Sequence, residues 1–354
     1  MSRSAVVIFN LGGPDSPDAI EPFLFNLFND PAIIGLPGLL RKPLAKFIAH
    51  RRAPVARKIF AHLGGRSPLL EETEVQADAL AQEITREMGR EDESRVFIAM
   101  RYWHPFIETA VERVQAFDPD KIVLLPLYPQ YSTTTTASSL KEWCRAAAAI
   151  DLEAPTRAVC CYPVEEGYIT GLVGMIAPAI EEARRQVASR AEPRVLFSAH
   201  GLPKKIIATG DPYQWQIEQT AAVTARVLAL SGPDWTVCYQ SRVGPLEWIG
   251  PSLNDELTRA AGDGVPVVVV PVAFVSEHSE TLVELDIEYR KIAQDLGVPA
   301  YVRVPAIGVD KSFISALARI AVQALKGGEE TRSAAGGRPC PATTGRCPLS
   351  GTGA

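Results

Sequence analysis

Short runs of apolar, β-branched residues alternate with segments of helical periodicity along almost the whole chain. Such a run is typical of a strand in a parallel sheet, because helices cover both of its faces. The strand candidates are Val6–Phe9, Val96–Met100, Ile122–Leu125, Ala158–Cys161, Val195–Phe197, Val237–Tyr239, Val267–Val270 and Tyr301–Val304. Helices are expected between several of them, at Glu71–Met88, Ile107–Ala116, Glu166–Ser189 and Trp215–Ala229. The alternation predicts an α/β protein with parallel sheets covered by helices.

The same pattern occurs twice along the chain. VVIFNLGGP resembles VLFSAHGLP, FIAMRYWHP resembles VCYQSRVGP, and IVLLPLYPQYSTTT resembles VVVVPVAFVSEHSET. Because the three pairs keep their order, we expect two similar doubly wound halves, residues 1–155 and 156–326, with a cleft between them. Residues 327–354 are rich in Gly, Ser, Thr and Pro and are expected to form a flexible tail.

Residues 33–52 combine large apolar side chains with basic ones. This segment is either an ordinary amphipathic helix on the core or an apolar lip with a basic rim. A lip of that kind would suit a flat apolar ligand or the membrane interface, and the sequence leaves both readings open.

Composition narrows the class of protein. The chain has 354 residues, 47% of them hydrophobic, and a net charge of −5, which gives no reason to expect a nucleic-acid partner. We find neither a signal peptide nor a run of the ~20 apolar residues that a membrane span needs. Six cysteines in a chain of this length do not form a disulfide framework, so a reducing cytoplasm is expected.

A stripe of carboxylates follows the four-valine strand at Val267–Val270. Its members, spaced three, four and four residues apart on one face of an expected helix, are Glu277, Glu280, Glu284 and Glu288. The ordinary reading is a solvated acidic face. However, open α/β sheets bind ligands at the carboxyl ends of their strands, and His278 beside Glu280 is a plausible pair for a divalent metal.

His200 follows another strand of the same half, within FSAHGLP. A histidine there is either a hydrogen-bonded structural residue or one that exchanges a proton or binds a metal. In the first half, Arg101 and Tyr102 occupy the matching strand end, and Tyr128 follows the next strand. An arginine can hold a carboxylate, and a tyrosine gives a flat apolar wall with a polar tip. Trp248 could form a similar wall, although a tryptophan more often belongs to the core.

Two tail cysteines, Cys340 and Cys347, are either free thiols or part of an iron–sulfur or zinc site completed by cysteines such as Cys161 and Cys144. No CxxC pair supports the second reading.

Nine stretches occur in order from near the start to about residue 320, namely NLGGP, HRRAP, LGGRSPL, MRYWHP, LYPQYS, LFSAHGLP, GDPY, QSRVGPLEWIGP and SEHSETLVELDIEY. Together they make the chain resemble a ferrochelatase of the bacterial haem-synthesis type. The resemblance implies two Rossmann-like halves of the type II chelatase kind. It also implies a lyase-class enzyme that inserts ferrous iron into protoporphyrin IX with release of two protons.

The resemblance also implies roles for individual residues. His200 and Glu280 would be the catalytic and metal-contacting pair, supported by an acidic path through His278, Glu277, Glu284 and Glu288. The expected porphyrin contacts are Leu11, Arg101, Tyr102, Tyr128 and Trp248. Animal members carry a cluster ligand where this chain has Thr133, so a [2Fe–2S] cluster held by Cys340, Cys347, Cys161 and Cys144 is a separate hypothesis.

The alternatives are a coproporphyrin III ferrochelatase, a haem or porphyrin carrier without turnover, and a cobalt chelatase for a corrin precursor. The apolar segment at 33–52 favours protoporphyrin, which carries only two propionates, and predicts peripheral association with the inner membrane. A homodimer is one of the oligomeric states that the sequence leaves open.

Overall fold

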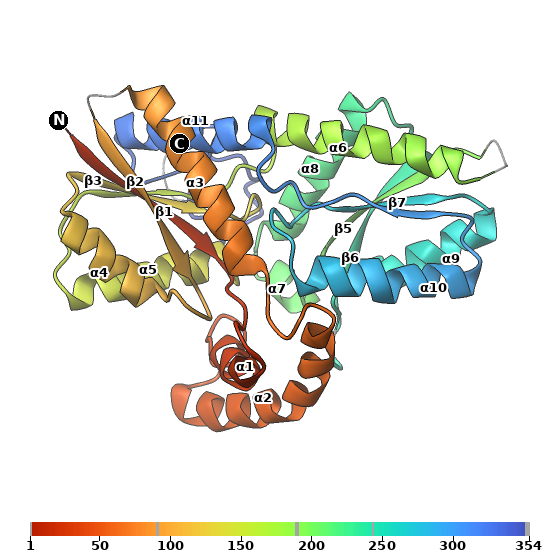
Figure 1. Cartoon of the computed structure of the whole chain (residues 1–354), viewed down its shortest axis with the longest axis horizontal. Helices are drawn as coiled ribbons and strands as arrows, with labels where there is room; N and C mark the ends of the chain where they lie inside the picture. The colour runs from red at the N-terminus through yellow and green to blue at the C-terminus, as the bar shows by residue number, and fades with distance from the viewer. Residues whose placement is uncertain (1, 90–91, 188–190, 243, 351–354) are drawn as a thin grey trace. The chain divides into compact units, whose positions relative to one another are not determined.

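The computed structural model describes residues 2–89, 92–187, 191–242 and 244–350, which form two compact units (Figure 1). Unit 1 consists of Met1–Cys161 and Leu317–Arg338, and unit 2 consists of Tyr162–Ala316 and Pro339–Ala354. Residues 188 and 189 of the helix expected at Glu166–Ser189 lie outside the described residues.

Unit 1 contains a five-stranded parallel sheet in the order β2-β1-β3-β4-β9. Its strands are β1 (Arg3–Asn10), β2 (Glu93–Met100), β3 (Lys121–Pro126), β4 (Thr156–Val159) and β9 (Thr331–Arg332). Its helices are η1 (Pro17–Ala19), α1 (Ile20–Phe28), α2 (Gly38–Ala61), α3 (Leu69–Met88), α4 (Ile107–Phe117) and α5 (Thr136–Ala149). Figure 1 shows α3 on one face of the sheet and α4 and α5 on the other, as right-handed crossovers require when the strand order reverses at β1.

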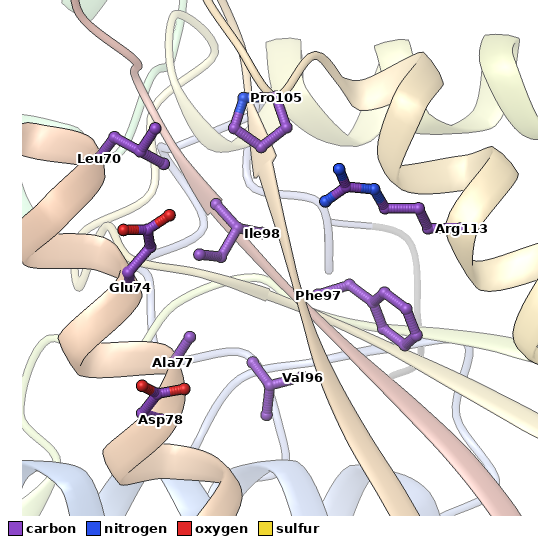
Figure 2. A pocket seen from close by; sticks show the side chains of 9 residues that line it. All are labelled: Leu70, Glu74, Ala77, Asp78, Val96, Phe97, Ile98, Pro105 and Arg113. Atoms are coloured by element: carbon purple, nitrogen blue, oxygen red, sulfur yellow. The ribbon is translucent and has the colours of Figure 1, made fainter.

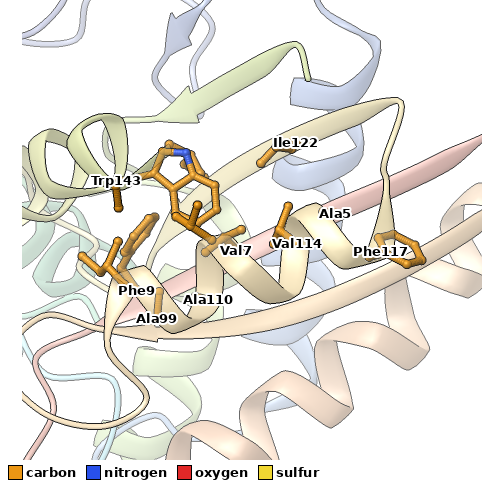
Figure 3. Packing of buried hydrophobic residues seen from close by; sticks show 13 residues of the cluster. Ala5, Val7, Phe9, Ala99, Ala110, Val114, Phe117, Ile122 and Trp143 are labelled. Carbon is orange, nitrogen blue, oxygen red and sulfur yellow. The ribbon is translucent and has the colours of Figure 1, made fainter. Parts of the chain in front are cut away.

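Apolar side chains of β1 explain why this sheet is buried on both faces. Ala5, Val7 and Phe9 point to one face and pack with α4 and α5, where the Phe9 and Trp143 rings meet edge to face at 6.0 Å (Figure 3). Val6 and Ile8 alternate with them and are also fully buried. A continuous apolar run is therefore required here, as the sequence indicates.

Unit 2 repeats this architecture with four parallel strands in the order β6-β5-β7-β8. Its strands are β5 (Arg194–His200), β6 (Trp235–Gln240), β7 (Val267–Pro271) and β8 (Tyr301–Arg303). Its helices are α6 (Glu166–Arg185), α7 (Lys204–Ala208), α8 (Tyr213–Val227), η2 (Gly232–Asp234), α9 (Leu253–Asp263), η3 (Glu280–Tyr289) and α10 (Arg290–Leu296). The last helix, α11 (Lys311–Lys326), begins in unit 2 and ends in unit 1.

The strand orders confirm the internal duplication. β2-β1-β3-β4 in unit 1 corresponds to β6-β5-β7-β8 in unit 2, and the three repeated sequence pairs lie on β1/β5, β2/β6 and β3/β7. All eight expected strands are present, and the α/β prediction of two Rossmann-like halves is confirmed.

The structure differs from the expected division at the end of the chain. β4 belongs to unit 1, which therefore ends its first segment at Cys161, and α11 and β9 return the chain to that unit. Residues 339–350, expected to form a flexible tail, contact unit 2, where the Arg346 N–H donates to the Gly210 carbonyl oxygen at 3.0 Å. Main-chain pairing of this kind needs no apolar periodicity, so composition does not reveal it.

The first half of helix α2 exposes large apolar side chains. Its buried positions there are the small residues Ala45 and Ala49, of which Ala49 packs against α1, whereas Leu39 and Phe47 are 92% and 63% exposed. Residues 38–52 are therefore not an ordinary amphipathic segment, because their larger apolar side chains mostly face away from the core. Among the described residues no helix is long and apolar enough to cross a membrane.

Candidate active site

The candidate catalytic residues of unit 2 gather where its strands end. His200 is the last residue of β5, and the segment after β7 leads into η3, whose first residue is Glu280. Parallel strands place their carboxyl ends at one edge of a sheet, which brings these side chains together.

His200 presents one ring nitrogen to Glu280. Its Nδ1 lies 2.6 Å from the carbonyl oxygen of Gly201, which can only accept, so Nδ1 donates to it. The other ring nitrogen, Nε2, faces Glu280, whose Oε1 lies 3.7 Å away. A nitrogen placed in this way can exchange a proton or contact an incoming cation.

Glu280 lies between two imidazoles. Its other oxygen, Oε2, is 3.7 Å from Nε2 of His278, and the Glu280 side chain is 28% exposed. Burial lowers the pKa of His278 below its ordinary value, so this ring is neutral at neutral pH. Two ligand atoms that each lie about 2.0–2.2 Å from one ion are roughly 3–4 Å apart, so both separations leave room for an ion beside the carboxylate.

The carboxylate stripe lies on a π-helix, not on the α-helix that its spacing suggests. η3 runs for ten residues before α10 continues it. Longer π-helical turns are rare, and they occur mostly at functional sites. Three of its carbonyl oxygens accept bonds from outside the helix, since Gln240 donates to Glu280, Tyr301 to Leu285 and Arg290 to Asp286. These donors compensate for the weaker geometry of the wider helix.

Glu284 is held at the end of β6. It accepts hydrogen bonds from the Ser241 N–H at 2.8 Å, the Ser241 hydroxyl at 2.6 Å and the Gln240 amide at 3.1 Å. Burial, and next the negative charge of Glu280, raise the pKa of Glu284 above its ordinary value. A carboxyl group of this kind can hold a proton that an ordinary glutamate would release.

The other two members of the expected acidic path differ from Glu284. Glu277 faces Arg303 on β8, with Oε1 2.6 Å from Nη1, and also accepts from the Ala306 N–H at 3.0 Å. Its charge is therefore largely neutralised. Glu288 lies further along η3 and is exposed.

Trp248 and Tyr213 border the His200 loop. Trp248 forms a β-bridge with Pro203, and a Cβ added at Gly201 would lie 3.2 Å from its ring, which explains the glycine there. The Tyr213 hydroxyl donates to the carbonyl oxygen of His200 at 3.1 Å. The two aromatic residues therefore support the loop that presents the imidazole.

In unit 1 a buried carboxylate, Asp30, organises Arg101. Asp30 accepts from Arg101 Nη2 at 2.9 Å, from the Tyr102 hydroxyl at 2.8 Å and from the Ser138 hydroxyl, while Arg101 Nε also contacts Ser138 at 2.8 Å. Tyr102 was expected to contact substrate, but it is only 1% exposed and its hydroxyl is used by Asp30. Burial, and next the charge of Asp30, raise the pKa of Tyr102 well above its ordinary value.

Two further candidates of unit 1 are half-buried. Leu11 follows β1 directly, and Tyr128 follows β3, where its ring packs against the α4–α5 core. Burial raises the pKa of the Tyr128 hydroxyl.

Two pockets among the described residues do not contain these side chains. A pocket of about 210 Å³ lies at the edge strand β2, between α3 and α4 (Figure 2). Another, of about 290 Å³, lies between the start of α8 and Thr343–Thr344 in unit 2. Each is below the roughly 300–1,000 Å³ typical of small-molecule sites, so neither fits a flat macrocycle.

Comparisons with known proteins decide what kind of site this is. Residues 3–325 match the family model described as Ferrochelatase. This chain belongs to the ferrochelatase family. A ferrochelatase of Phenylobacterium zucineum is 51% identical over 98% of this chain and 97% of its own length. A ferrochelatase of Hyphomonas neptunium is 49% identical over 98% of this chain and 94% of its own length.

A ferrochelatase inserts ferrous iron into a porphyrin in haem synthesis, and membership makes this chain a metal chelatase of the lyase class. The sirohydrochlorin chelatase SirB from Bacillus subtilis subspecies spizizenii, solved with cobalt, matches 92% of this chain and 96% of its own at 11% identity, with a TM-score of 0.52. That likeness confirms the fold alone.

The cysteines do not fit a cluster in this member of the family. Across residues 2–89, 92–187, 191–242 and 244–350, no group of three or more His, Cys, Asp or Glu side chains is arranged to hold a metal ion. Cys144 is exposed, whereas Cys161, Cys340 and Cys347 are buried.

Sequence reasoning missed several residues that hold the candidate side chains of each unit in place. They are Asp30, Ser138, Ser198, Tyr213, Gln240, Ser241 and Arg303. For Gln240 and Ser241 a signal existed, because they directly follow a repeated strand. Asp30 could have been noticed as a lone carboxylate within an apolar stretch.

Proposed function

We propose that the porphyrin is protoporphyrin IX, that His200 accepts its pyrrole protons, and that Glu280 guides ferrous iron and stabilises the protonated imidazole. The observation that carries this proposal is the placement of the His200 ring, whose Nδ1 donates to the Gly201 carbonyl oxygen and whose Nε2 faces Glu280 at 3.7 Å. Two N–H protons must leave the macrocycle as the cation enters, so a base beside a carboxylate is the chemistry required.

The released protons would leave along the π-helix. Glu280 would take the proton from His200 and pass it to Glu284, whose raised pKa lets it hold a proton near the site. The exposed Glu288 would release it to water. Because iron is the substrate, its contacts must be incomplete and easily broken, in keeping with a Glu280 side chain that is 28% exposed.

Arg101, Leu11, Tyr128 and Trp248 would line or steer the porphyrin, with Arg101 offering its guanidinium to a propionate. The fixed position of Arg101 on Asp30 supports that role, since a guanidinium held in place loses little freedom on binding. Tyr102 would act through Asp30 and not by touching substrate.

The decisive experiment is anaerobic turnover with ferrous iron, followed by loss of porphyrin fluorescence, on protoporphyrin IX and coproporphyrin III in parallel. We expect His200→Ala and Glu280→Gln each to lower kcat by about 10²-fold or more, since a positioned base contributes 10²–10⁴-fold. His62→Ala, which removes an exposed histidine at the end of α2, is the matched control and should keep full activity.

The outcomes separate the alternatives. Preference for coproporphyrin would keep the catalytic roles and overturn the choice of substrate. Full activity in both site variants would reject the assigned roles, whereas porphyrin binding without turnover in the unaltered protein would point to a carrier.

We also propose that the protein works in the cytoplasm and associates peripherally with the inner membrane through α2. The exposed Leu39, Leu40 and Phe47, with Lys42 and Lys46 in the same helix, support this. In flotation with anionic phospholipid vesicles, Leu39→Glu should abolish cofloating that the unaltered protein shows. Equal flotation of both proteins would contradict the proposal.

The [2Fe–2S] cluster and the homodimer are tested on the same preparation. Anaerobically purified protein that has a visible charge-transfer band and acid-labile sulfide would support a cluster held by Cys340, Cys347, Cys161 and Cys144, and protein that lacks both would reject it. Light scattering during gel filtration gives the oligomeric state.

A further inference from the structure

Gln240 joins the two elements that carry the candidate catalytic residues. It is the last residue of β6, is fully buried, and pairs in register with His200 on β5. Its carbonyl oxygen accepts from the Gly201 N–H at 2.9 Å. Its side-chain amide donates to the Glu280 carbonyl oxygen at 2.9 Å and to the Glu284 carboxylate at 3.1 Å. One residue therefore contacts the neighbour of His200 and the backbone of Glu280.

The orientation of this amide is determined by its partners. A carbonyl oxygen and a carboxylate only accept, so the nitrogen of Gln240 must face the π-helix. The amide oxygen then accepts from the hydroxyl of Ser198 at 2.8 Å, and Ser198 is fully buried, two residues before His200 on β5. The amide nitrogen and the amide oxygen of Gln240 therefore both have hydrogen-bond partners.

The residue after Gln240 supports the same arrangement. Ser241 has a φ of 58°, a left-handed conformation that is uncommon for residues other than glycine. In that conformation its N–H and hydroxyl both reach Glu284. A strained residue such as Ser241 persists only when the surrounding structure holds its backbone in place, and such residues cluster at functional sites.

We infer that Ser198 and Gln240 are positioning residues that set the separation of the His200 imidazole and the Glu280 carboxylate. The inference rests on the proposed roles of His200 and Glu280. Ser198 acts through Gln240, because its hydroxyl fixes the amide that holds the first turn of the π-helix. A displacement of about 1 Å between reacting groups can cost 10²-fold in rate. Loss of the hydrogen bonds that Ser198 and Gln240 form should therefore lower turnover strongly.

The test measures kcat, the KM for ferrous iron and the KM for porphyrin in Gln240→Leu, Gln240→Glu and Ser198→Ala. We expect kcat to fall about ten-fold or more in both Gln240 variants and less in Ser198→Ala, with the porphyrin KM changed less than about two-fold. Gln240→Glu keeps the shape but places a second anion against Glu284, so it should be no better than Gln240→Leu.

A double mutant distinguishes positioning from general weakening of the fold. Since Ser198 acts through Gln240, Ser198→Ala combined with Gln240→Leu should be no worse than Gln240→Leu alone. Leu257→Ala, which opens a cavity in the core of unit 2, is the control for lost stability and should keep kcat below its melting temperature.

Multiplicative losses in the double mutant, or equal loss of kcat in Leu257→Ala, would overturn the inference. Failure of the proposed function is recognised separately, because His200→Ala and Glu280→Gln would then retain activity. If those two variants are inactive while both Gln240 variants are fully active, only the positioning role of Ser198 and Gln240 is rejected.

Discussion

Arg303 should stabilise unit 2 by joining two carboxylates that border the π-helix. Its Nη1 lies 2.6 Å from Glu277 Oε1 and its Nη2 lies 2.5 Å from Asp286 Oδ2. The Arg303 side chain is only 9% exposed. Arg303→Met keeps most of the apolar stem but leaves both carboxylates without this partner.

The structure gives the size of the effect. Removing one partner of a buried ion pair costs about 3–5 kcal/mol. Glu277 and Asp286 retain 18% and 26% of their side-chain exposure, so water relieves part of that cost. We expect Arg303→Met to lower the free energy of unfolding by about 2–3 kcal/mol, a shift of roughly 1 M in the urea midpoint.

The assay is equilibrium urea unfolding followed by circular dichroism. Glu277→Gln in the same protein should recover about 1 kcal/mol, because it removes one of the unpaired charges. If the two units unfold separately, only the transition of unit 2 should move. A loss below about 0.5 kcal/mol, typical of exposed ion pairs, would refute the reasoning.

Two further predictions concern stability alone. Six of the nine tyrosines have pKa values raised mainly by burial, namely Tyr102, Tyr128, Tyr213, Tyr239, Tyr289 and Tyr301. Their contribution is complete below the unfolded pKa of about 10 and is lost as pH rises above it, so titration at 295 nm should show these six ionising only with cooperative alkaline unfolding. On α6, Gly167→Ala should cost about 1–3 kcal/mol, because the new Cβ would lie 2.4 Å from the Ser312 carbonyl oxygen. Gly174→Ala, with open space, should stabilise the helix by about 0.5–1 kcal/mol, and equilibrium urea unfolding measures both glycine variants.

The fold was predictable because its signal is local. Each strand candidate is a short apolar run, and burial on both faces requires such a run, as β1 and β7 illustrate. The division into units was harder to predict from the sequence, because β9 pairs with β4 through main-chain groups that any sequence supplies. The sequence also did not predict the π-helix, because carboxylates four residues apart are compatible with either helix type. The side chains that donate to its carbonyl oxygens lie outside η3.

Sequence reasoning could propose site residues only where a candidate side chain lies near the end of a strand in a repeated motif. His200 ends β5 and Arg101 follows β2 directly, whereas Glu280 begins η3. Their hydrogen-bond partners are distant in sequence, as with Asp30, which is 71 residues from Arg101. Pattern reasoning cannot pair residues across such separations, so it did not indicate that the Tyr102 hydroxyl donates to Asp30.

The duplicated fold places different chemistry on equivalent strand ends, which suggests separate tasks for the units. β6 ends at Gln240, whose amide contacts Glu280 and Glu284, whereas Arg101, which follows β2 directly, is held by Asp30. Asp30→Asn should therefore raise the porphyrin KM about ten-fold, corresponding to some 1.4 kcal/mol of binding, and leave the iron KM unchanged. Asp30→Glu is the charge-conserving control, expected to recover part of the affinity. An equal rise in the iron KM would contradict the division, because Asp30 would then influence metal entry as well as porphyrin binding.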